Sequence, residues 1–402
     1  MIHDALVIGG GPAGATVACL LARAGWSVAL LEKASFPRRK VCGEFISATT
    51  LPLLRTLGLG EMFLDMAGPP VREIGLYTGN HMLAAPMPVN PEHTPGWGRA
   101  LGREHLDALL LDYAQLAGAK VLQPCTATAI TRDQGISICT AKQSGSDTKI
   151  EIQARVLIAA QGSWEKGTLP APGISDQKPR SSDLLAFKAH FENADLPLPR
   201  MPLLSFPGGY GGMVHTDHGR MSLSCCIRRD VLQKCRNNST RYHRAADAVL
   251  AHIMKNCNGV QQTLKGAGTR DPWLAAGPVR PGIHTLYKDG VFATGNAAGE
   301  AHPVVAEGIS MAMQGSWLLA EILIARRAQV LCGKMNDIGS AYTRAWYRCF
   351  APRLYISTII AHLAMQPAAT KCLLPLFQHV PELLTFCTRL SGKIRNVAPV
   401  NP

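Results

Sequence analysis

A glycine-rich turn near the start of the chain constrains its fold more than any other feature. Ala5 to Ile8 are apolar and suit a buried strand, and Gly9-Gly-Gly-Pro-Ala-Gly14 follows as a tight turn. Residues 15–24 then carry apolar side chains at helical spacing, and the apolar run 27–31 ends in Glu32. Strand, glycine turn, helix, strand and acid in this order predict a βαβ unit that binds a dinucleotide.

Each residue of this fingerprint has a physical role. Gly9 permits the turn, Gly11 lets the backbone approach a pyrophosphate, and Gly14 allows the helix to pack closely on the strand. The helix N-terminus supplies free N–H groups and a partial positive charge, and Glu32 can accept hydrogen bonds from a ribose. A glycine turn that binds nothing is the alternative, but the complete set of elements favours a bound nucleotide.

Composition indicates a globular protein with a substantial core. The chain has 402 residues, of which 47% are hydrophobic and 17% charged, enough for up to three domains. No run reaches the roughly 18 uninterrupted apolar residues of a membrane span, and a strand with Asp4 stands where a secretory signal would begin. We therefore expect a cytoplasmic protein. The 12 cysteines show neither zinc spacing nor a disulfide framework, so no metal site is predicted.

Positive charge is concentrated at the C-terminal end. Residues 326–402 contain ten Lys and Arg against Asp337 and Glu382, which gives +8 of the net charge of +13. Interleaved with apolar helices, this charge favours an anionic surface such as the inner membrane, to which the protein would bind peripherally, an acidic acyl carrier protein, or a phosphorylated substrate. A solvated basic face is the alternative. No recognition motif for nucleic acid accompanies the charge, so no nucleic-acid partner is expected.

Hydrophobic periodicity predicts the remaining elements. We expect a loop over residues 33–47, a helix over 101–114 and a buried strand over 154–160. Residues 183–230 indicate a mixed sheet, with Tyr210 in a glycine loop over 207–212. The remaining predictions are a hairpin (127–131 with 137–141), a last strand (291–294), a long helix from near Gly308, and short C-terminal helices bounded by Pro352, Pro367 and Pro381.

Four motifs together resemble one enzyme family. They are Gly9 to Gly14 with Glu32, Arg39-Lys-Val-Cys-Gly-Glu-Phe-Ile-Ser47, Gly102-Arg-Glu-His-Leu-Asp107, and Gly295-Asn-Ala-Ala-Gly-Glu-Ala-His-Pro303 leading to Glu307-Gly-Ile-Ser310. In this order they resemble FAD-dependent oxidoreductases of the para-hydroxybenzoate hydroxylase type, most closely the geranylgeranyl reductase branch. The resemblance covers most of the chain.

This resemblance implies an α/β fold with a Rossmann-like FAD-binding domain, an inserted substrate domain built on a mixed β-sheet, and a helical C-terminus. The FAD-binding domain would be discontinuous, over residues 1–70, 98–165 and 285–330. Residues 71–97 and 166–284 would form the substrate domain, and 331–402 the basic C-terminal region.

The resemblance also implies FAD as the bound cofactor, with NADH or NADPH as a transient reductant. A second strand–turn–helix at Gly295 is typical of the family, which folds this segment over the flavin. The implied cofactor contacts are Gly9, Gly11, Ala13, Gly14, Glu32, Lys33, Arg39, Cys42, Gly43, Arg103, Ala127, Gly162, Gly295, Asn296, Pro303, Gly308 and Ile309.

Two positions depart from the family pattern. Gln161-Gly162 stands where an Asp-Gly pair is usual, and Asn296 replaces the Asp of the distal motif. Asn keeps an acceptor oxygen for a ribityl hydroxyl, so FAD binding should survive. The family links the position of Gln161 to the nicotinamide reductant, so this substitution bears on the electron donor.

The resemblance leaves three functions open. The first is an NAD(P)H-reduced monooxygenase that hydroxylates an apolar aromatic or polyketide-like substrate. The second is an ene reductase that saturates isoprenoid double bonds, and the third is a redox-silent homologue that binds lipids or carrier-bound chains. Halogenation is set aside because the Trp-x-Trp-x-Ile-Pro signature is missing.

Few residues are candidates for the chemistry. His302 and Cys42 are the candidate catalytic residues, and Tyr210 is the candidate substrate contact. Glu44, Glu300 and Glu307 are further carboxyl groups that can handle a proton.

Overall fold

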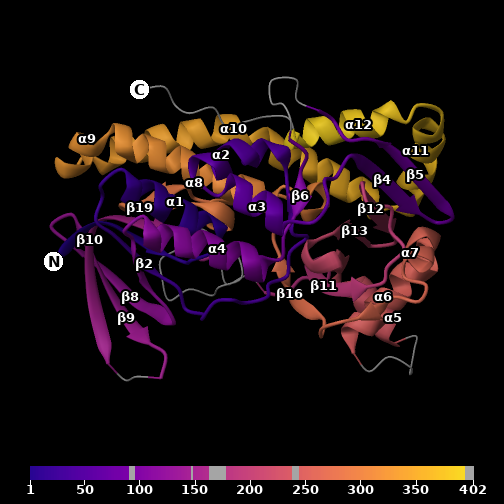
Figure 1. The fold of residues 1–402 in the computed structure, drawn as a ribbon, viewed down its shortest axis with the longest axis horizontal. Helices are drawn as coiled ribbons and strands as arrows, with labels where there is room; N and C mark the ends of the chain where they lie inside the picture. Colours follow the sequence, from indigo (N-terminus) through magenta and orange to yellow (C-terminus); the bar gives the residue numbers. More distant parts are fainter. Residues whose placement is uncertain (90–95, 146–147, 163–177, 238–243, 394–402) are drawn as a thin grey trace.

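Two β-sheets lie side by side and a layer of helices runs along both. The computed structural model describes the chain except residues 90–95, 146–147, 163–177, 238–243 and 394–402. In Figure 1 the first sheet is at the left, the second at the right, and helix α10 extends along the top of both.

The first sheet is the Rossmann-like core that the glycine turn predicts. Its parallel strands follow the order β19-β10-β1-β2-β7, and β18 adds an antiparallel edge. Apolar residues on one face pack against α1, α4 and α8, and those on the other face pack against the β8–β9 hairpin. The elements are β1 (Ile2–Ile8), α1 (Pro12–Arg23), β2 (Val28–Leu31), α4 (Arg103–Leu116), β7 (Lys120–Leu122), β8 (Cys125–Asp133), β9 (Ile136–Gln143), β10 (Lys149–Ala159), β18 (Tyr287–Lys288), β19 (Val291–Ala293) and α8 (Gly308–Ala325).

The second sheet is mixed and stands beside the first. Its order is β15-β11-β14-β13-β12-β4-β5, with β16 beside β11, and only β12 and β4 pair in parallel. Helices α5 to α7 pack against one of its faces through a separate apolar cluster. The elements are β4 (Glu73–Thr78), β5 (His81–Pro86), β11 (Leu184–Glu192), β12 (Arg200–Phe206), β13 (Gly209–His215), β14 (Met221–Arg228), α5 (Arg229–Asn237), α6 (Ala245–Asn256), α7 (Asn258–Thr263), β15 (Gly268–Thr269) and β16 (Leu274–Val279).

Short elements connect the two sheets. They are β3 (Phe45–Ile46) paired with β6 (Arg99–Ala100), β17 (Gly282–Ile283) paired with β20 (Gly299–Glu300), α2 (Leu51–Thr56), α3 (Gly60–Met66), and the 3-10 turns η1 (Ala48–Thr50), η2 (Asp217–Gly219), η3 (Gly295–Ala297) and η4 (Pro303–Val305). The mixed α/β fold class with a Rossmann-like domain is confirmed.

The predicted glycine loop over residues 207–212 is wrong, because most of it is the central strand β13. A Cβ atom on Gly211 would stand 2.7 Å from the carbonyl oxygen of Ser224 on β14, and Gly209 is similarly tight against Phe206. The glycines therefore permit close strand packing, and only Gly208, with φ of +72°, makes the turn. Tyr210 thus lies on a strand and is buried.

The prediction that Pro352 bounds a short helix is also wrong. Helix α10 (Met335–Ala364) continues through Pro352, which is exposed, so water can solvate the carbonyl group that loses its hydrogen bond. The buried Tyr342, Trp346 and Phe350 anchor the helix on the first sheet and α8. Pro367 is the first residue of α11 (Pro367–His379), and Pro381 directly precedes α12 (Glu382–Thr388), which is followed by η5 (Arg389–Lys393). The short helix α9 (Arg327–Leu331) joins α8 to α10.

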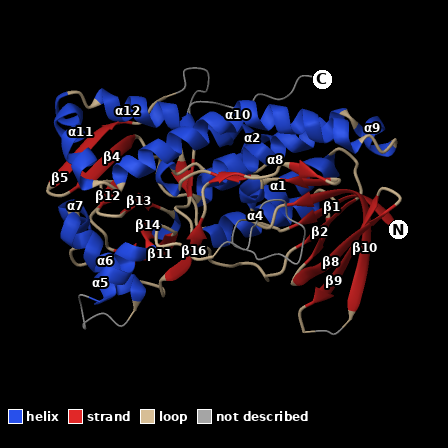
Figure 2. Ribbon diagram, turned by 180° about the vertical axis from the view of Figure 1, so that it is seen from behind, coloured by secondary structure: helices blue, strands red, loops and turns tan. Residues whose placement is uncertain are grey.

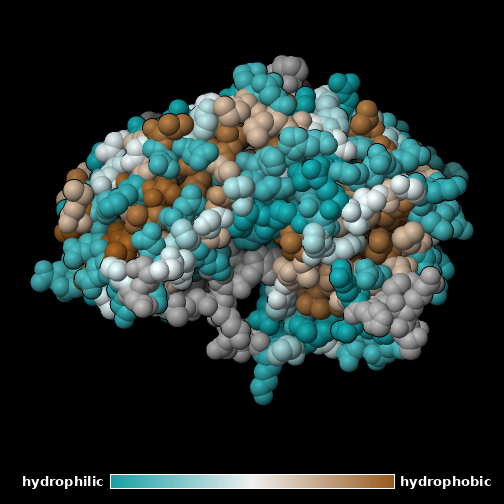
Figure 3. All heavy atoms as spheres, turned by 60° about the horizontal axis from the view of Figure 1, so that its bottom comes forward, coloured by the Kyte–Doolittle hydropathy of each residue, from teal (hydrophilic) through white to brown (hydrophobic). Residues whose placement is uncertain are grey.

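Within the described residues, one helix is long and apolar enough to span a membrane by those criteria alone. It is α8, and 72% of the qualifying window is buried inside the protein. Figure 2 shows it beneath α10, beside α1. The face that Figure 3 brings forward mixes hydrophilic areas with separate apolar patches.

Candidate functional site

The glycine turn forms a tight backbone cradle. A Cβ atom on Gly14 would lie 1.8 Å from the carbonyl oxygen of Gly9, and one on Gly9 would lie 2.5 Å from the carbonyl oxygen of Ala160. Gly11, by contrast, has open space up to the Arg103 guanidinium, 3.7 Å away. The turn thus packs closely on the strands yet leaves room above Gly11, as a pyrophosphate requires.

Glu32 closes the end of this cradle. Its carboxylate accepts hydrogen bonds from the backbone N–H of Gly10 at 2.8 Å and of Ala34 at 2.9 Å. The side chain is buried and lines the cavity described below. Its position at the end of β2 is the one expected for a ribose acceptor.

The distal glycine segment meets the first turn. Gly295 has φ of +63°, and a Cβ atom there would stand 2.7 Å from the Ala13 side chain. The two segments, which lie 281 positions apart in the sequence from Gly14 to Gly295, therefore make one cradle. Asn296 donates its amide N–H to Glu300 at 3.1 Å, so an amide suits this position better than a second carboxylate would.

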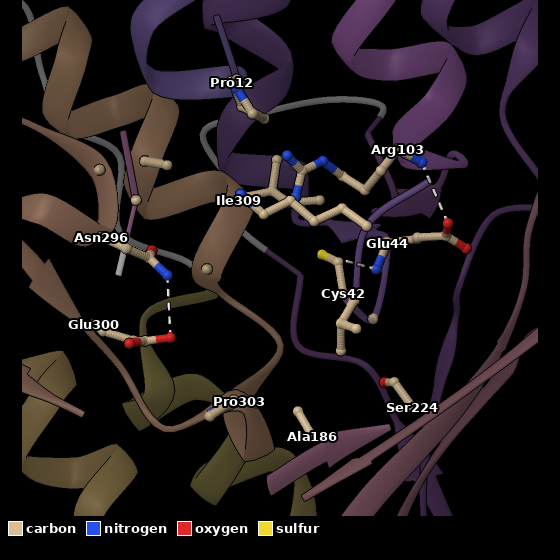
Figure 4. A pocket seen from close by; sticks show the side chains of 18 of the residues that line it. Pro12, Cys42, Glu44, Arg103, Ala186, Ser224, Asn296, Glu300, Pro303 and Ile309 are labelled. Atoms are coloured by element: carbon tan, nitrogen blue, oxygen red, sulfur yellow. Dashed lines mark hydrogen bonds between the residues drawn. The ribbon is translucent and has the colours of Figure 1, made fainter. Parts of the chain in front are cut away.

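A cavity of about 550 Å³ extends from this cradle to the second sheet. Figure 4 shows Pro12 and Arg103 at one end and Ala186 and Ser224 at the other. Most of the predicted cofactor contacts line it, namely Gly9, Gly11, Ala13, Glu32, Lys33, Cys42, Gly43, Arg103, Ala127, Gly162, Gly295, Asn296, Pro303, Gly308 and Ile309.

Two predicted contacts lie elsewhere. Gly14 supports the turn from inside α1, and Arg39 points to Asp271, with which it pairs at 3.7 Å. The neighbouring bases Arg38 and Lys40 line the cavity instead. A run of three bases does not by itself reveal which one faces inward.

Arg103 lies beside the cradle as a buried cation. Its guanidinium binds both carboxylate oxygens of Asp107, at 2.6 and 2.7 Å. Burial alone would lower the pKa of Arg103, but the Asp107 carboxylate outweighs burial and the pKa is raised. The guanidinium also hydrogen-bonds to the Cys42 sulfur.

The Cys42 side chain lines the cavity at the junction of the two sheets. The backbone N–H of Glu44 donates to its Sγ at 3.4 Å, and Glu44 adopts φ of +65° in doing so (Figure 4). Two donors, from Glu44 and Arg103, thus converge on one sulfur atom.

Glu44 itself belongs to a buried group of charges. Its Oε1 accepts from the Lys188 ammonium and its Oε2 pairs with His190 Nε2 at 2.8 Å, and all three side chains are buried. Burial would raise the pKa of Glu44, but the hydrogen bond from His190 and the charge of Lys188 lower it to about 2. Sequence reasoning missed Lys188 and His190. Their alternate spacing in the apolar strand β11, which puts both on one face, was the available signal.

The far end of the cavity carries a second polar pair. The Tyr210 hydroxyl lies 3.1 Å from His302 Nδ1, and the ring centroid of His302 is 6.0 Å from that of the exposed His362. Burial, and then His362, lower the pKa of His302 to about 4, while burial raises the pKa of Tyr210 well above its usual value. Tyr210 lines the cavity, whereas His302 lies behind it on the side of α10.

The other candidate carboxyl groups are placed differently. Glu300 lines the cavity beside Asn296, but Glu307 is buried against Lys393, which donates to it at 3.0 Å. Glu307 therefore holds the C-terminal segment in place rather than facing the cavity.

The side-chain amide of Gln161 shows whether the lining of the cavity suits a bound FAD. Both polar atoms of its buried amide lack a hydrogen-bond partner among the described residues, although the residue lines the cavity. A buried amide without partners is costly unless a ligand satisfies it. Together with the two-segment glycine cradle, this orphaned amide fits a flavin dinucleotide.

Comparison with known proteins agrees with this fit. The sequence profile of the FAD binding domain matches residues 3–331. The menaquinone reductase of Mycolicibacterium smegmatis is 24% identical over 97% of this chain and 91% of its own length. The conditioned medium factor receptor 1 of Dictyostelium discoideum is 26% identical over 80% of this chain, which spans only 63% of that receptor.

Solved structures share the fold over nearly the whole chain. The myxobacterial chondrochloren halogenase CndH, an FAD-dependent halogenase, superposes with a TM-score of 0.78 at 19% identity, over 98% of this chain and 97% of its own. PqsL from Pseudomonas aeruginosa, a probable FAD-dependent monooxygenase, superposes with a TM-score of 0.69 at 17% identity, over 98% of this chain and 99% of its own.

Proposed function

The chain belongs to the FAD-binding-domain family of oxidoreductases, and on that premise we propose that it is a monooxygenase, reduced by NADH or NADPH, which hydroxylates an apolar aromatic or polyketide-like substrate. The observation that carries this proposal is the polar pair Tyr210–His302, which leads from the apolar end of the cavity toward the exposed His362.

This pair suits the activation of a phenol. Hydroxylation of an aromatic ring requires an electron-rich ring carbon. A phenol gains such a carbon when its hydroxyl proton is removed. A substrate hydroxyl next to Tyr210 can hydrogen-bond to the Tyr210 hydroxyl, which in turn pairs with His302 Nδ1, so that a proton can be relayed along this pair. His362 connects this position to solvent.

The rest of the cavity orients an apolar molecule. Apolar side chains line the substrate end and disfavour water there, namely Ala186, Met201, Leu203, Met213 and Val279. When bound, FAD supplies the two-electron chemistry with oxygen. The chain supplies binding through the glycine cradle and Arg103, and proton transfer through Tyr210.

Oxygen uptake tests the proposal directly. The purified FAD-loaded protein is mixed with NADH or NADPH and a panel of alkyl-substituted phenols, and we expect one of them to stimulate both flavin reduction and oxygen consumption, with formation of a hydroxylated product. If neither nicotinamide reduces the flavin while another donor does, or if turnover proceeds without oxygen, the monooxygenase proposal is overturned.

A tyrosine variant tests the proton path. We expect Tyr210→Phe to bind FAD normally but to lower substrate-stimulated turnover by about 100–10,000-fold, the usual range for one acid–base group. Tyr347→Phe, at an exposed tyrosine of α10, is the matched control and should behave as the wild type. Equal activity of the two variants would exclude Tyr210 from the reaction.

An ene reductase of the geranylgeranyl reductase type is the second candidate, and Cys42 favours it. Reduction of a double bond requires a proton as well as a hydride, and the Cys42 thiol lies at the cavity wall between Arg103 and Glu44. This function predicts anaerobic turnover of an isoprenoid that Cys42→Ser abolishes. A purified protein that shows no flavin absorbance even after FAD is added would instead favour the redox-silent binding protein.

A further inference from the structure

The C-terminal helices present apolar side chains to solvent at one end of the molecule. Helices α10, α11 and α12 pack against one another in turn, at the end where the second sheet lies (Figures 1 and 2). On each helix the exposed apolar residues are spaced by four and so form a stripe. These residues, which we group as the docking face, are Tyr355, Ile359 and Leu363 on α10, Leu376 and Val380 at α11, and Phe386 and Leu390 at α12 and η5, with exposures of 39–64%.

The opposite sides of the same helices cover the substrate end of the cavity. Ala361 and Ala364 of α10 pack in one cluster with Tyr210, and Leu384 of α12 packs in another with Leu203. Tyr210 and Leu203 both line the cavity. The docking face is therefore separated from the cavity by a single layer of helices.

The exposed charges of this region are mostly positive. Arg344, Arg348, Lys371 and Arg389 are exposed, and Glu382 is the one exposed acid among described residues 338–393. Two further cations, Arg353 and Lys393, are buried and hold the helices through Gln314 and Glu307. Exposed apolar stripes flanked by basic side chains are typical of segments that lie in the interface of an anionic membrane.

We propose that α10, α11 and α12 dock the enzyme on an anionic phospholipid bilayer through this face. Apolar side chains enter the headgroup region and the exposed cations contact lipid phosphates. This arrangement places the substrate end of the cavity next to the phase in which an apolar substrate dissolves. The docking itself does not depend on which flavin reaction the cavity performs.

Vesicle sedimentation of the full-length, FAD-loaded protein tests this proposal. We expect binding to vesicles of phosphatidylcholine with phosphatidylglycerol, at least about 10-fold weaker binding to phosphatidylcholine alone, and a similar loss at high salt. Ile359→Glu and Phe386→Glu should each reduce binding by about 10-fold, because each puts a negative charge into the interface. Leu116→Glu, at a 79% exposed leucine that ends α4, is the matched control and should bind as the wild type.

The outcomes are separable from catalysis because no turnover is measured. Retained flavin absorbance shows that a variant is folded. Absence of binding to anionic vesicles at low salt, or binding that Ile359→Glu and Phe386→Glu leave unchanged, overturns the proposal. A dimer in light scattering that Ile359→Glu dissociates, without vesicle binding, would assign the face to a second copy, and binding of an acidic acyl carrier protein in place of vesicles would assign it to that partner.

Discussion

The two ends of the cavity are built in different ways. The nucleotide end consists largely of backbone from two short glycine segments, in which the absence of side chains creates the space. The substrate end consists of side chains from β11 to β14 and from the segment around His302, with buried groups whose pKa values are shifted. Substitutions that add atoms to the glycines of the nucleotide end should therefore weaken FAD binding strongly. Substitutions of polar side chains at the substrate end should leave FAD binding intact.

Substitution at the boundary between the two ends, where Glu44 pairs with Lys188, should lower the free energy of unfolding the most. Glu44→Ala leaves Lys188 buried without its carboxylate, and we expect a loss of about 3–5 kcal/mol in the free energy of unfolding, measured by urea denaturation. Glu192→Ala, which breaks the exposed pair with Arg270, should cost about 0–1 kcal/mol. A loss of similar size in both variants would mean that Glu44 does not hold the two sheets together.

At the nucleotide end, one methyl group should abolish tight cofactor binding. Gly14→Ala places a Cβ atom 1.8 Å from the Gly9 carbonyl oxygen, so the turn must move away from its position. We expect FAD to bind at least about 100-fold more weakly, about 2.7 kcal/mol, by titration of flavin fluorescence. Gly268→Ala, where nothing lies within 4 Å and the backbone is ordinary, is the control, and should bind FAD as the wild type.

At the substrate end we expect a smaller effect that depends on pH. Because the pKa of His302 is lowered from 6.5 to about 4, only the unfolded chain takes up this proton between those values. The contribution of neutral His302 to the free energy of unfolding is therefore fully present above pH 6.5 and is lost as the pH falls toward 4. His302→Asn should flatten this part of the curve of unfolding free energy against pH, and an unchanged slope would show that His302 is not buried as a neutral group.

Local signals predicted the nucleotide end well and the substrate end poorly. The strand, turn, helix and Glu32 follow one another within 32 residues, so the apolar periodicity and the glycines indicate the βαβ unit without knowledge of the rest of the chain. In the 207–212 segment the same reasoning failed, because the glycines accommodate a neighbouring strand rather than a turn. Pro352 misled for a related reason: packing of α10 on the first sheet overrides the local preference to end a helix.

By itself, the sequence determined that the chain begins with a dinucleotide-binding turn, because turn geometry depends on the conformational freedom of adjacent residues. It also located the distal segment through its motif. Only the tertiary structure decided that Glu44 meets Lys188 and His190 and that Tyr210 meets His302, since these partners are 92 to 146 residues apart. Alternation along β11 places Lys188 and His190 on one face, but which strands become neighbours, and which residue from elsewhere in the chain then meets that face, follows from the packing of the whole sheet.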